Sequence, residues 1–263
     1  MKRAKDHSKR THRSRRLKKI IIGSTFGITI FALTVFPSLN NSCTPTNFYK
    51  DGINLTAALV NPPTIPEELD ASKCNIGVYY ESGNYSLENT KIYGANYYGV
   101  VVDGNINNVS VNISNSIIHD IGEKPFNSAQ HGVGIYYSAM GQGTATGNIS
   151  DSYIYAYQKG GIVLEGKGVN VNATKNKVHG IGQVNFIAQN GIEVAYGANG
   201  SIVDNSIYAN YNTGSEGGEA NPAGKTPPSG LYVSSALLLN HPGNLSQHQN
   251  FFNRNQRNIT NVQ

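Results

Sequence analysis

The sequence contains no tryptophan, only two cysteines and few charged residues, which make up 14% of its 263 residues. After the N-terminal segment, no apolar run repeats at the three- and four-residue spacing of an amphipathic helix. Valine and isoleucine instead alternate with polar residues over short stretches, among 29 glycines. This pattern is typical of β-strands, and it predicts an all-β protein.

Basic residues are scarce outside the N-terminus. Residues 1–19 hold ten Lys or Arg and one Asp, which leaves 11 of the 21 basic residues and 15 of the 16 acidic residues for the rest of the chain. The formal net charge of +5 therefore hides a mildly acidic body. A nucleic-acid-binding protein normally carries a basic stripe on its folded part, so we expect no nucleic-acid partner.

The basic stretch leads into an apolar run from Ile20 to Phe36. This order is typical of an export signal. An uncleaved membrane anchor is the alternative, because the run is short for a membrane span and no clean cleavage site follows it. Both interpretations place the chain from about residue 44 outside the membrane. We assign residues 1–43 to an export signal or anchor and expect a secreted or extracytoplasmic protein that meets the membrane only through residues 20–36.

The two cysteines are Cys43 and Cys74. Export to an oxidising compartment favours a disulfide between them, with free thiols as the alternative. Lipidation of Cys43 is disfavoured, because Asn40 stands where a lipoprotein signal has an aliphatic residue.

Two short units alternate along the chain at a period typical of a solenoid. The first has two apolar residues separated by one residue, in most cases just after a glycine, and begins at positions 76, 100, 133, 162, 192 and 231. The second is a polar turn followed by an apolar residue, as in Asn115-Ser116-Ile117-Ile118-His119. Strand-length units at this period predict stacked β-coils, with equivalent residues aligned in columns.

Two apolar columns are predicted to fill the core. One contains Ile76, Val100, Val133, Ile162, Ile192 and Leu231, and the other contains Ile92, Ile118, Ile154, Val178 and Ile207. The proline-containing residues 44–70 are assigned to a cap or linker over the first coil, and residues 71–263 to the solenoid. Residues 212–229 lack periodicity and predict a long loop, and Phe251 and Phe252 predict a last coil.

These repeats resemble those of right-handed parallel β-helix proteins, the fold of pectate lyases and of periplasmic copper-enzyme maturation proteins. The loops at residues 125–132 and 185–191 also resemble those of uncharacterised secreted bacterial β-helix proteins. The resemblance implies a single-stranded right-handed parallel β-helix of about six to seven coils. It does not imply one activity, because this fold hosts lyases, hydrolases, epimerases, adhesins and binding proteins.

Two outward-facing columns are candidates for a binding face. One alternates strictly between tyrosine and histidine, and the other begins by alternating tyrosine with an acid. Aromatic rings beside hydrogen-bonding groups suit sugars, which have an apolar face and a polar rim. Stacked rings also stabilise a sheet without any ligand, and this structural role is the alternative. The columns read Tyr93, His119, Tyr155, His179, Tyr208 and Tyr79, Asp103, Tyr136, Glu165, Ala195, Ser234.

Catalytic signals are weak. Asp103 and Glu165 are expected to lie two coils apart, near the upper end of the carboxyl separation of inverting glycosidases. A lyase of the pectate type would use an arginine base, but the only arginines after residue 16 are Arg254 and Arg257. No residue spacing predicts a metal site, no cofactor is expected, and calcium would enter only with a lyase activity.

Three functions remain open at this point. The first is an exported β-helix that binds polysaccharide or another cell-envelope ligand. The second is a polysaccharide lyase or glycoside hydrolase with an atypical site. The third is a structural or adhesive surface protein. The loops at 120–131 and 180–190 are predicted to wall any cleft, because loops carry function, and Gln130, Gln158 and Gln189 are predicted to form an amide ladder beneath them.

Overall fold

The computed structural model describes residues 42–213 and 233–262. Within these ranges the chain forms strands and no helices, and no helix there could therefore cross a membrane. The predicted signal or anchor and most of the predicted loop at 212–229 lie outside the described residues.

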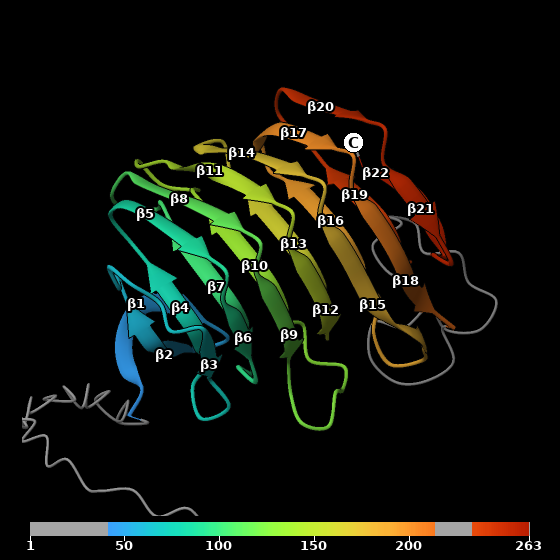
Figure 1. The fold of residues 1–263 in the computed structure, drawn as a ribbon. Helices are drawn as coiled ribbons and strands as arrows, with labels where there is room; N and C mark the ends of the chain where they lie inside the picture. Colours follow the sequence, from blue (N-terminus) through green and yellow to red (C-terminus); the bar gives the residue numbers. More distant parts are fainter. Residues whose placement is uncertain (1–41, 214–232, 263) are drawn as a thin grey trace, which may run out of the picture. The chain divides into compact units, whose positions relative to one another are not determined.

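The strands form three sheets, which are called sheets A, B and C (Figure 1). Sheet A contains β1 (Thr44–Lys50), β2 (Ile53–Val60), β4 (Ile76–Tyr80), β7 (Tyr98–Asp103), β10 (Val133–Ser138), β13 (Gly160–Glu165), β16 (Asn190–Ala195), β19 (Ser235–Asn240) and β22 (Arg257–Val262). Sheet B contains β3 (Glu68–Asp70), β6 (Lys91–Tyr93), β9 (Ile117–Ile121), β12 (Tyr153–Tyr157), β15 (Lys177–Val184), β18 (Ser206–Asn212) and β21 (Phe251–Asn253). Sheet C contains β5 (Gly83–Glu88), β8 (Val109–Ser114), β11 (Ala145–Ser150), β14 (Val169–Thr174), β17 (Asn199–Val203) and β20 (Leu245–His248).

Neighbours within a sheet come from successive turns of the chain. From β4 onward each strand of sheet A pairs in parallel with the strand three places later, and sheets B and C follow the same rule. Each turn therefore contributes one strand to every sheet. The predicted right-handed parallel β-helix is confirmed.

The apolar column predicted for sheet B is confirmed residue by residue. Ile92, Ile118 and Ile154 are register partners on adjacent strands, and Val178 and Ile207 continue the series. All five side chains are fully buried. Leu69 precedes them on β3 and Phe252 follows them on β21, so the predicted last coil is present too.

The column predicted for sheet A is partly wrong. The structure aligns Val78, Val100, Ile135, Ile162, Ile192 and Leu237. Ile76 and Val133 therefore lie two residues too early, and Leu231 lies outside the described residues. Ile76 and Val133 are buried in a separate hydrophobic cluster, so the apolar pattern of their strands begins two residues early.

The glycine that precedes many of the sheet A units explains their spacing. Gly77 faces the corner with sheet B, where a Cβ would lie 2.7 Å from the Ile92 side chain. A Cβ on Gly99 would lie 2.5 Å from the Ile118 side chain, and one on Gly134 would lie 2.5 Å from Ile154. Only glycine leaves room there for the isoleucine column of sheet B.

The segment predicted as a cap does more than cover the first coil. Strands β2 and β3 already belong to sheets A and B, whereas β1 turns back on β2 as an antiparallel hairpin. Asp51 and Gly52 form its tip with positive φ angles of 51° and 86°, as a two-residue Asp-Gly turn requires. A disulfide between Cys43 and Cys74 ties the base of the hairpin to the solenoid.

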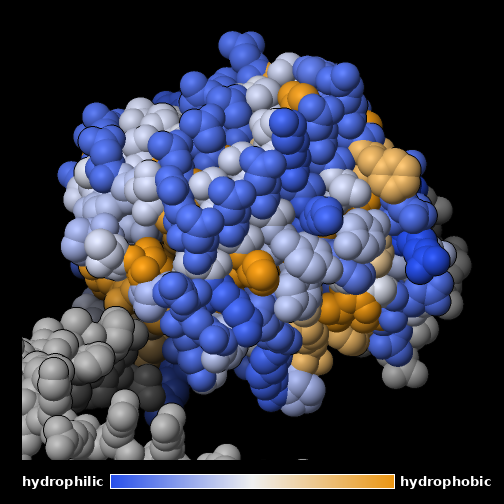
Figure 2. Space-filling view, in the orientation of Figure 1, coloured by the Kyte–Doolittle hydropathy of each residue, from blue (hydrophilic) through white to orange (hydrophobic). Residues whose placement is uncertain are grey.

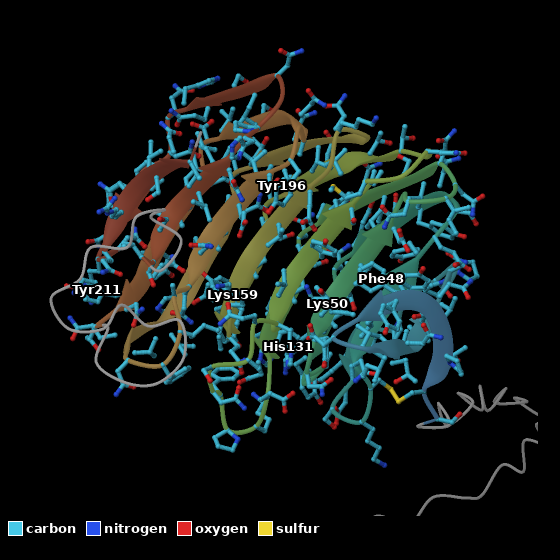
Figure 3. The ribbon with its side chains drawn as sticks, turned by 180° about the vertical axis from the view of Figure 1, so that it is seen from behind. Phe48, Lys50, His131, Lys159, Tyr196 and Tyr211 are labelled. Atoms are coloured by element: carbon cyan, nitrogen blue, oxygen red, sulfur yellow. A yellow bond between two sulfur atoms is a disulfide. The ribbon has the colours of Figure 1, made fainter. Side chains whose placement is uncertain are left out.

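The tip half of this β1–β2 hairpin folds back over the outer face of the later strands of sheet A and creates a second hydrophobic cluster. Phe48 and Leu55 of the hairpin are buried in it together with Tyr79, Tyr98 and Val101 of sheet A. In Figure 3 the labelled Phe48 and Lys50 lie against the strands of sheet A, on the side away from the viewer of Figure 1. The opposite side, in Figure 2, is mainly hydrophilic with scattered apolar residues, so it shows no broad apolar contact surface.

Candidate functional site

A cavity of about 350 Å³ lies between the hairpin and sheet A, and is called the hairpin pocket. Ligand sites typically enclose roughly 300–1,000 Å³. The hairpin contributes Phe48 and Lys50, and the strands of sheet A contribute both tyrosines and acids. The lining residues that matter below are Phe48, Lys50, Tyr79, Tyr98, Asp103, Tyr136 and Glu165.

Aromatic rings form one wall of the hairpin pocket. The Phe48 ring meets Tyr79, Tyr98 and Tyr136 edge-on, at centroid distances of 6.1, 5.6 and 5.9 Å. Tyr98 and Tyr136 stack on each other at 5.1 Å. Tyr136 is partly exposed, whereas Tyr79 and Tyr98 are buried. The wall therefore offers the partly exposed Tyr136 ring as an apolar surface, with Phe48 and Tyr98 as its buried support.

Two carboxylates face the same cavity, and each is bonded to a tyrosine. The Tyr79 hydroxyl donates to Asp103 at 2.8 Å, and the Tyr136 hydroxyl donates to Glu165. Asp103 also accepts the backbone N–H of Asn105 at 3.0 Å. These bonds fix the direction of both carboxylates, which leaves their remaining lone pairs able to accept bonds from a ligand.

The predicted column of alternating tyrosine and acid is wrong as a column, although its members do converge. Tyr79 and Tyr136 share one register with Val101 between them, and Asp103 and Glu165 share another with Ser138 between them. Ala195 continues the acidic register, but its next partner is Asn240 rather than Ser234. The two registers are two residues apart on the same face, so tyrosine hydroxyls reach the acids diagonally.

Burial changes the protonation of the acids near this pocket. The pKa of Glu165 is raised, chiefly by burial and next by the neighbouring Glu193, while Lys50 acts in the opposite direction. Burial also raises the pKa of Glu193 itself, against the effects of Lys159 and Asn190. Burial and the nearby Asp103 raise the pKa of Tyr79, which therefore stays a hydrogen-bond donor. Glu165 is thus the acid in the pocket that is more easily protonated than an ordinary glutamate.

The tyrosine–histidine column of sheet B has the predicted register. Tyr93, His119, Tyr155, His179 and Tyr208 are partners on adjacent strands. The rings of Tyr93 and His119 stack at 5.3 Å, those of His119 and Tyr155 at 4.8 Å, and those of His179 and Tyr208 at 4.3 Å. Because these faces cover one another, they are not free to stack on a sugar.

The ladder is interrupted between Tyr155 and His179, where Tyr153 stacks on Tyr155 and bonds to His179. A more open cavity of about 670 Å³ begins there, and is called the sheet B groove. Burial lowers the pKa of His179, which favours its neutral form. Arg254 also lines the groove, and no acidic side chain is among its described lining residues. Arg254 comes from the segment after β21. The middle coils of the β-helix, where a lyase of the pectate type would need its base, therefore contain no arginine.

The loop predictions are partly wrong. Neither the 120–131 nor the 180–190 loop lines the hairpin pocket, although residues 180–183 line the sheet B groove. The glutamines do not form an amide ladder. The buried Gln158 side chain accepts from the Glu123 N–H and donates to the Ala129 carbonyl, so it holds the first loop together.

No group of three or more possible metal ligands occurs among residues 42–213 and 233–262.

Phe48, Lys50 and Tyr98 were not predicted from the sequence as lining residues of the hairpin pocket. The signal for Phe48 and Lys50 was Asp51-Gly52 between alternating apolar residues, which is a strong hairpin signature.

A protein-family comparison matches residues 72–226 to the right handed beta helix region. That match spans more than half of the chain. The protein belongs to the right-handed β-helix family. A search of curated proteins and a search of solved structures each found no match. The fold of this β-helix protein does not define its activity, which has to be argued from its sites.

Proposed function

We propose that this β-helix protein is exported and binds a saccharide of the cell envelope or its surroundings in the hairpin pocket. The observation that carries the proposal is the meeting of an aromatic wall with two oriented carboxylates in one cavity. Sugars combine apolar C–H faces with hydroxyl donors, and Tyr136 with Asp103 offers the matching surface and acceptor.

The charge of the pocket narrows the class of sugar. Its lining contains Glu81, Asp103 and Glu165 but one described lysine, Lys50. None of the three acids forms an ion pair with a described residue within bonding distance. A uronate carboxylate would meet like charge here, which costs binding energy. We therefore expect a neutral saccharide rather than a polyuronate.

Titration calorimetry against neutral and uronic-acid oligosaccharides tests this proposal, after a glycan array has selected the ligand. The variants Tyr136→Ala and Asp103→Asn should each weaken binding at least about tenfold, the size expected for one lost hydrogen bond or ring contact. Tyr208→Ala is the matched control, because its ring lies in the ladder of sheet B, and it should bind normally. The proposal is wrong if no glycan binds, or if Tyr208→Ala weakens binding as much as Tyr136→Ala.

Glycoside hydrolysis is a second candidate, and the raised pKa of Glu165 favours it. A protonated Glu165 would act as general acid and donate its proton to the leaving oxygen. Asp103 would act as base on a water that attacks the anomeric carbon. Two strand spacings separate their backbones, about 9.6 Å, which is nearer to the roughly 6.5–9.5 Å between the carboxyls of inverting enzymes than to the roughly 5–5.5 Å of retaining ones. The test is product release with the anomeric form followed by NMR: Glu165→Gln should abolish turnover but keep binding, and turnover that survives in both Glu165→Gln and Asp103→Asn would exclude this pair.

A further inference from the structure

Strand β2 is anchored in sheet A by its parallel pairing with β4, and beyond that ladder the hairpin that completes the pocket is attached at three places. The disulfide to Cys74 holds its base, Phe48 packs on sheet A at its middle, and Asp51 reaches His131 at its tip. The first attachment is covalent and the second is apolar, so neither responds to pH near neutrality. The third joins the tip to the residue that precedes Gly132 and β10, three strands away from β2 in sheet A.

His131 is bonded at both ring nitrogens to carboxylates from different segments. Its Nδ1 lies 3.2 Å from Asp51 of the hairpin, and its Nε2 lies 2.8 Å from Glu123 of the loop between β9 and β10. The imidazole is only 7% exposed. Its face stacks on Tyr97 with the ring centroids 3.8 Å apart.

The two carboxylate contacts determine how many protons the His131 ring needs. A carboxylate can only accept, and a neutral imidazole has a single N–H, so it can satisfy one of the two acids. Imidazolium has two N–H groups and satisfies both. Stacking on the Tyr97 ring also favours a cation. Both contacts of the closed hairpin are therefore hydrogen bonds only when the ring carries a second proton.

The other charges near this contact do not replace that proton. Asp51, Glu123 and the Tyr97 hydroxyl are the titratable groups that face His131 from the elements packed on it, and the pKa of Tyr97 is raised by burial and next by the two acids. The neighbouring lysines act on other acids: Lys50 on Glu165, Lys159 on Glu193, and Lys124 through a hydrogen bond to Asp120. Lys73 and Lys124 line a cavity with Glu123 on the side of that loop. His131 is thus the cation that joins the two acids.

We propose that the β1–β2 hairpin is a proton-dependent lid on the hairpin pocket, closed while His131 is imidazolium and loosened when it loses its proton. The effect of the lid on ligands rests on the saccharide-binding proposal, whereas the movement of the hairpin does not depend on that proposal. Histidine ordinarily changes its charge between pH 5 and 8. Loss of one bond to a charged group should shift the ratio of closed to open hairpin by roughly ten- to hundredfold.

The test is a single fluorescent reporter in the hairpin. The chain has no tryptophan, and Tyr49 is a 67% exposed hairpin residue, so Tyr49→Trp adds the one indole of the protein. Its emission and anisotropy are followed without ligand from pH 5 to pH 8.5, with circular dichroism to confirm that the β-helix stays folded. We expect one transition, toward a more mobile indole at high pH.

Three further variants in the same background decide the result. His131→Gln keeps one donor group, the side-chain amide, but cannot gain a proton. It should therefore abolish the transition and leave the indole mobile at low pH too. In Glu123→Gln a neutral histidine can donate to Asp51 and accept from the new amide, so this variant should show a smaller transition. His119→Gln is the matched control, because His119 pairs with Asp120 at 2.6 Å on sheet B, and it should leave the transition unchanged.

The lid is disproved if the reporter shows no transition, or if the transition survives in His131→Gln. A transition that disappears in His119→Gln as well would also overturn it, since the signal would then not depend on the hairpin contact. No ligand enters these measurements. Failure to find a saccharide would therefore refute the binding proposal and leave the lid to be judged on its own.

Discussion

The hairpin pocket and the sheet B ladder both use tyrosines at regular places, but they leave different surfaces free. In the ladder the rings of neighbouring strands stack on each other at 4.3–5.3 Å. In the pocket the tyrosine hydroxyls are bonded to Asp103 and Glu165, and a separate hairpin supplies the facing wall. A repeated aromatic column therefore indicates self-packing, whereas the proposed site lies where a non-repeated segment crosses the repeat.

The largest effect should come from removing the apolar contact that holds the hairpin over sheet A. Phe48→Ala should destabilise the protein by about 3 kcal/mol, as expected for a buried phenylalanine, and should also weaken saccharide binding. Phe251, which is 61% exposed, provides the control Phe251→Ala with little change. Urea unfolding followed by circular dichroism measures both. Equal losses in the two variants would show that the hairpin contact is not special.

Untying the hairpin base comes next. The double variant Cys43→Ser, Cys74→Ser removes a link between residues 31 positions apart, and should lower the free energy of unfolding by about 2–4 kcal/mol. Thermal unfolding with and without reductant checks it: reductant should lower the melting temperature of the parent protein and not of the variant. A parent protein indifferent to reductant would contradict the prediction.

The ladder should matter for stability but not for ligand. Tyr208→Ala removes one stacked ring, worth about 1 kcal/mol, and should leave saccharide affinity unchanged. Tyr136→Ala removes a ring of similar size but should reduce affinity. If Tyr208→Ala lost binding, the separation of a structural aromatic column from a binding pocket would not hold.

The smallest effect is a pH dependence. Burial raises the pKa of Glu193, so the folded state holds that proton more tightly than the unfolded chain does. The resulting stabilisation is complete at low pH and is lost as the pH rises through the raised pKa. The side-chain amide that Glu193→Gln introduces is neutral at every pH. The melting temperature of this variant, relative to that of the parent, should therefore increase as the pH rises above the ordinary glutamate pKa of about 4.3. The exposed Glu88→Gln serves as control, and a gain of the same size there would refute the burial argument.

The sequence was sufficient to predict the fold and the register of sheet B. There a polar turn stands at a fixed distance before each apolar residue, as in Asn115 before Ile118 and Asp151 before Ile154. These turn residues adopt positive φ angles of 48° and 49°, which Asn and Asp tolerate better than most residues. The turn therefore sets the register, and the ladder residues follow from it.

Sheet A and the pocket were less predictable for physical reasons. Val133 is apolar because it packs in the cluster under the hairpin, so the apolar pattern placed Val133 where Ile135 belongs. Asp51-Gly52 is a local hairpin signal, but nothing local in the sequence tells where a hairpin will lie. The contact of Asp51 with His131 joins residues 80 positions apart, and it depends on where the disulfide and the packing of Phe48 on three tyrosines place the hairpin.

The glycine corner between sheets A and B has a consequence for how this chain can vary. At Gly99 and Gly134 even a methyl group would collide with the neighbouring isoleucine, so these positions do not tolerate any other residue. The segments between successive corners already differ in length by several residues and could lengthen further at small entropic cost. Variants of this protein should therefore gain new surface by insertion between the corners and lose their fold by substitution at them.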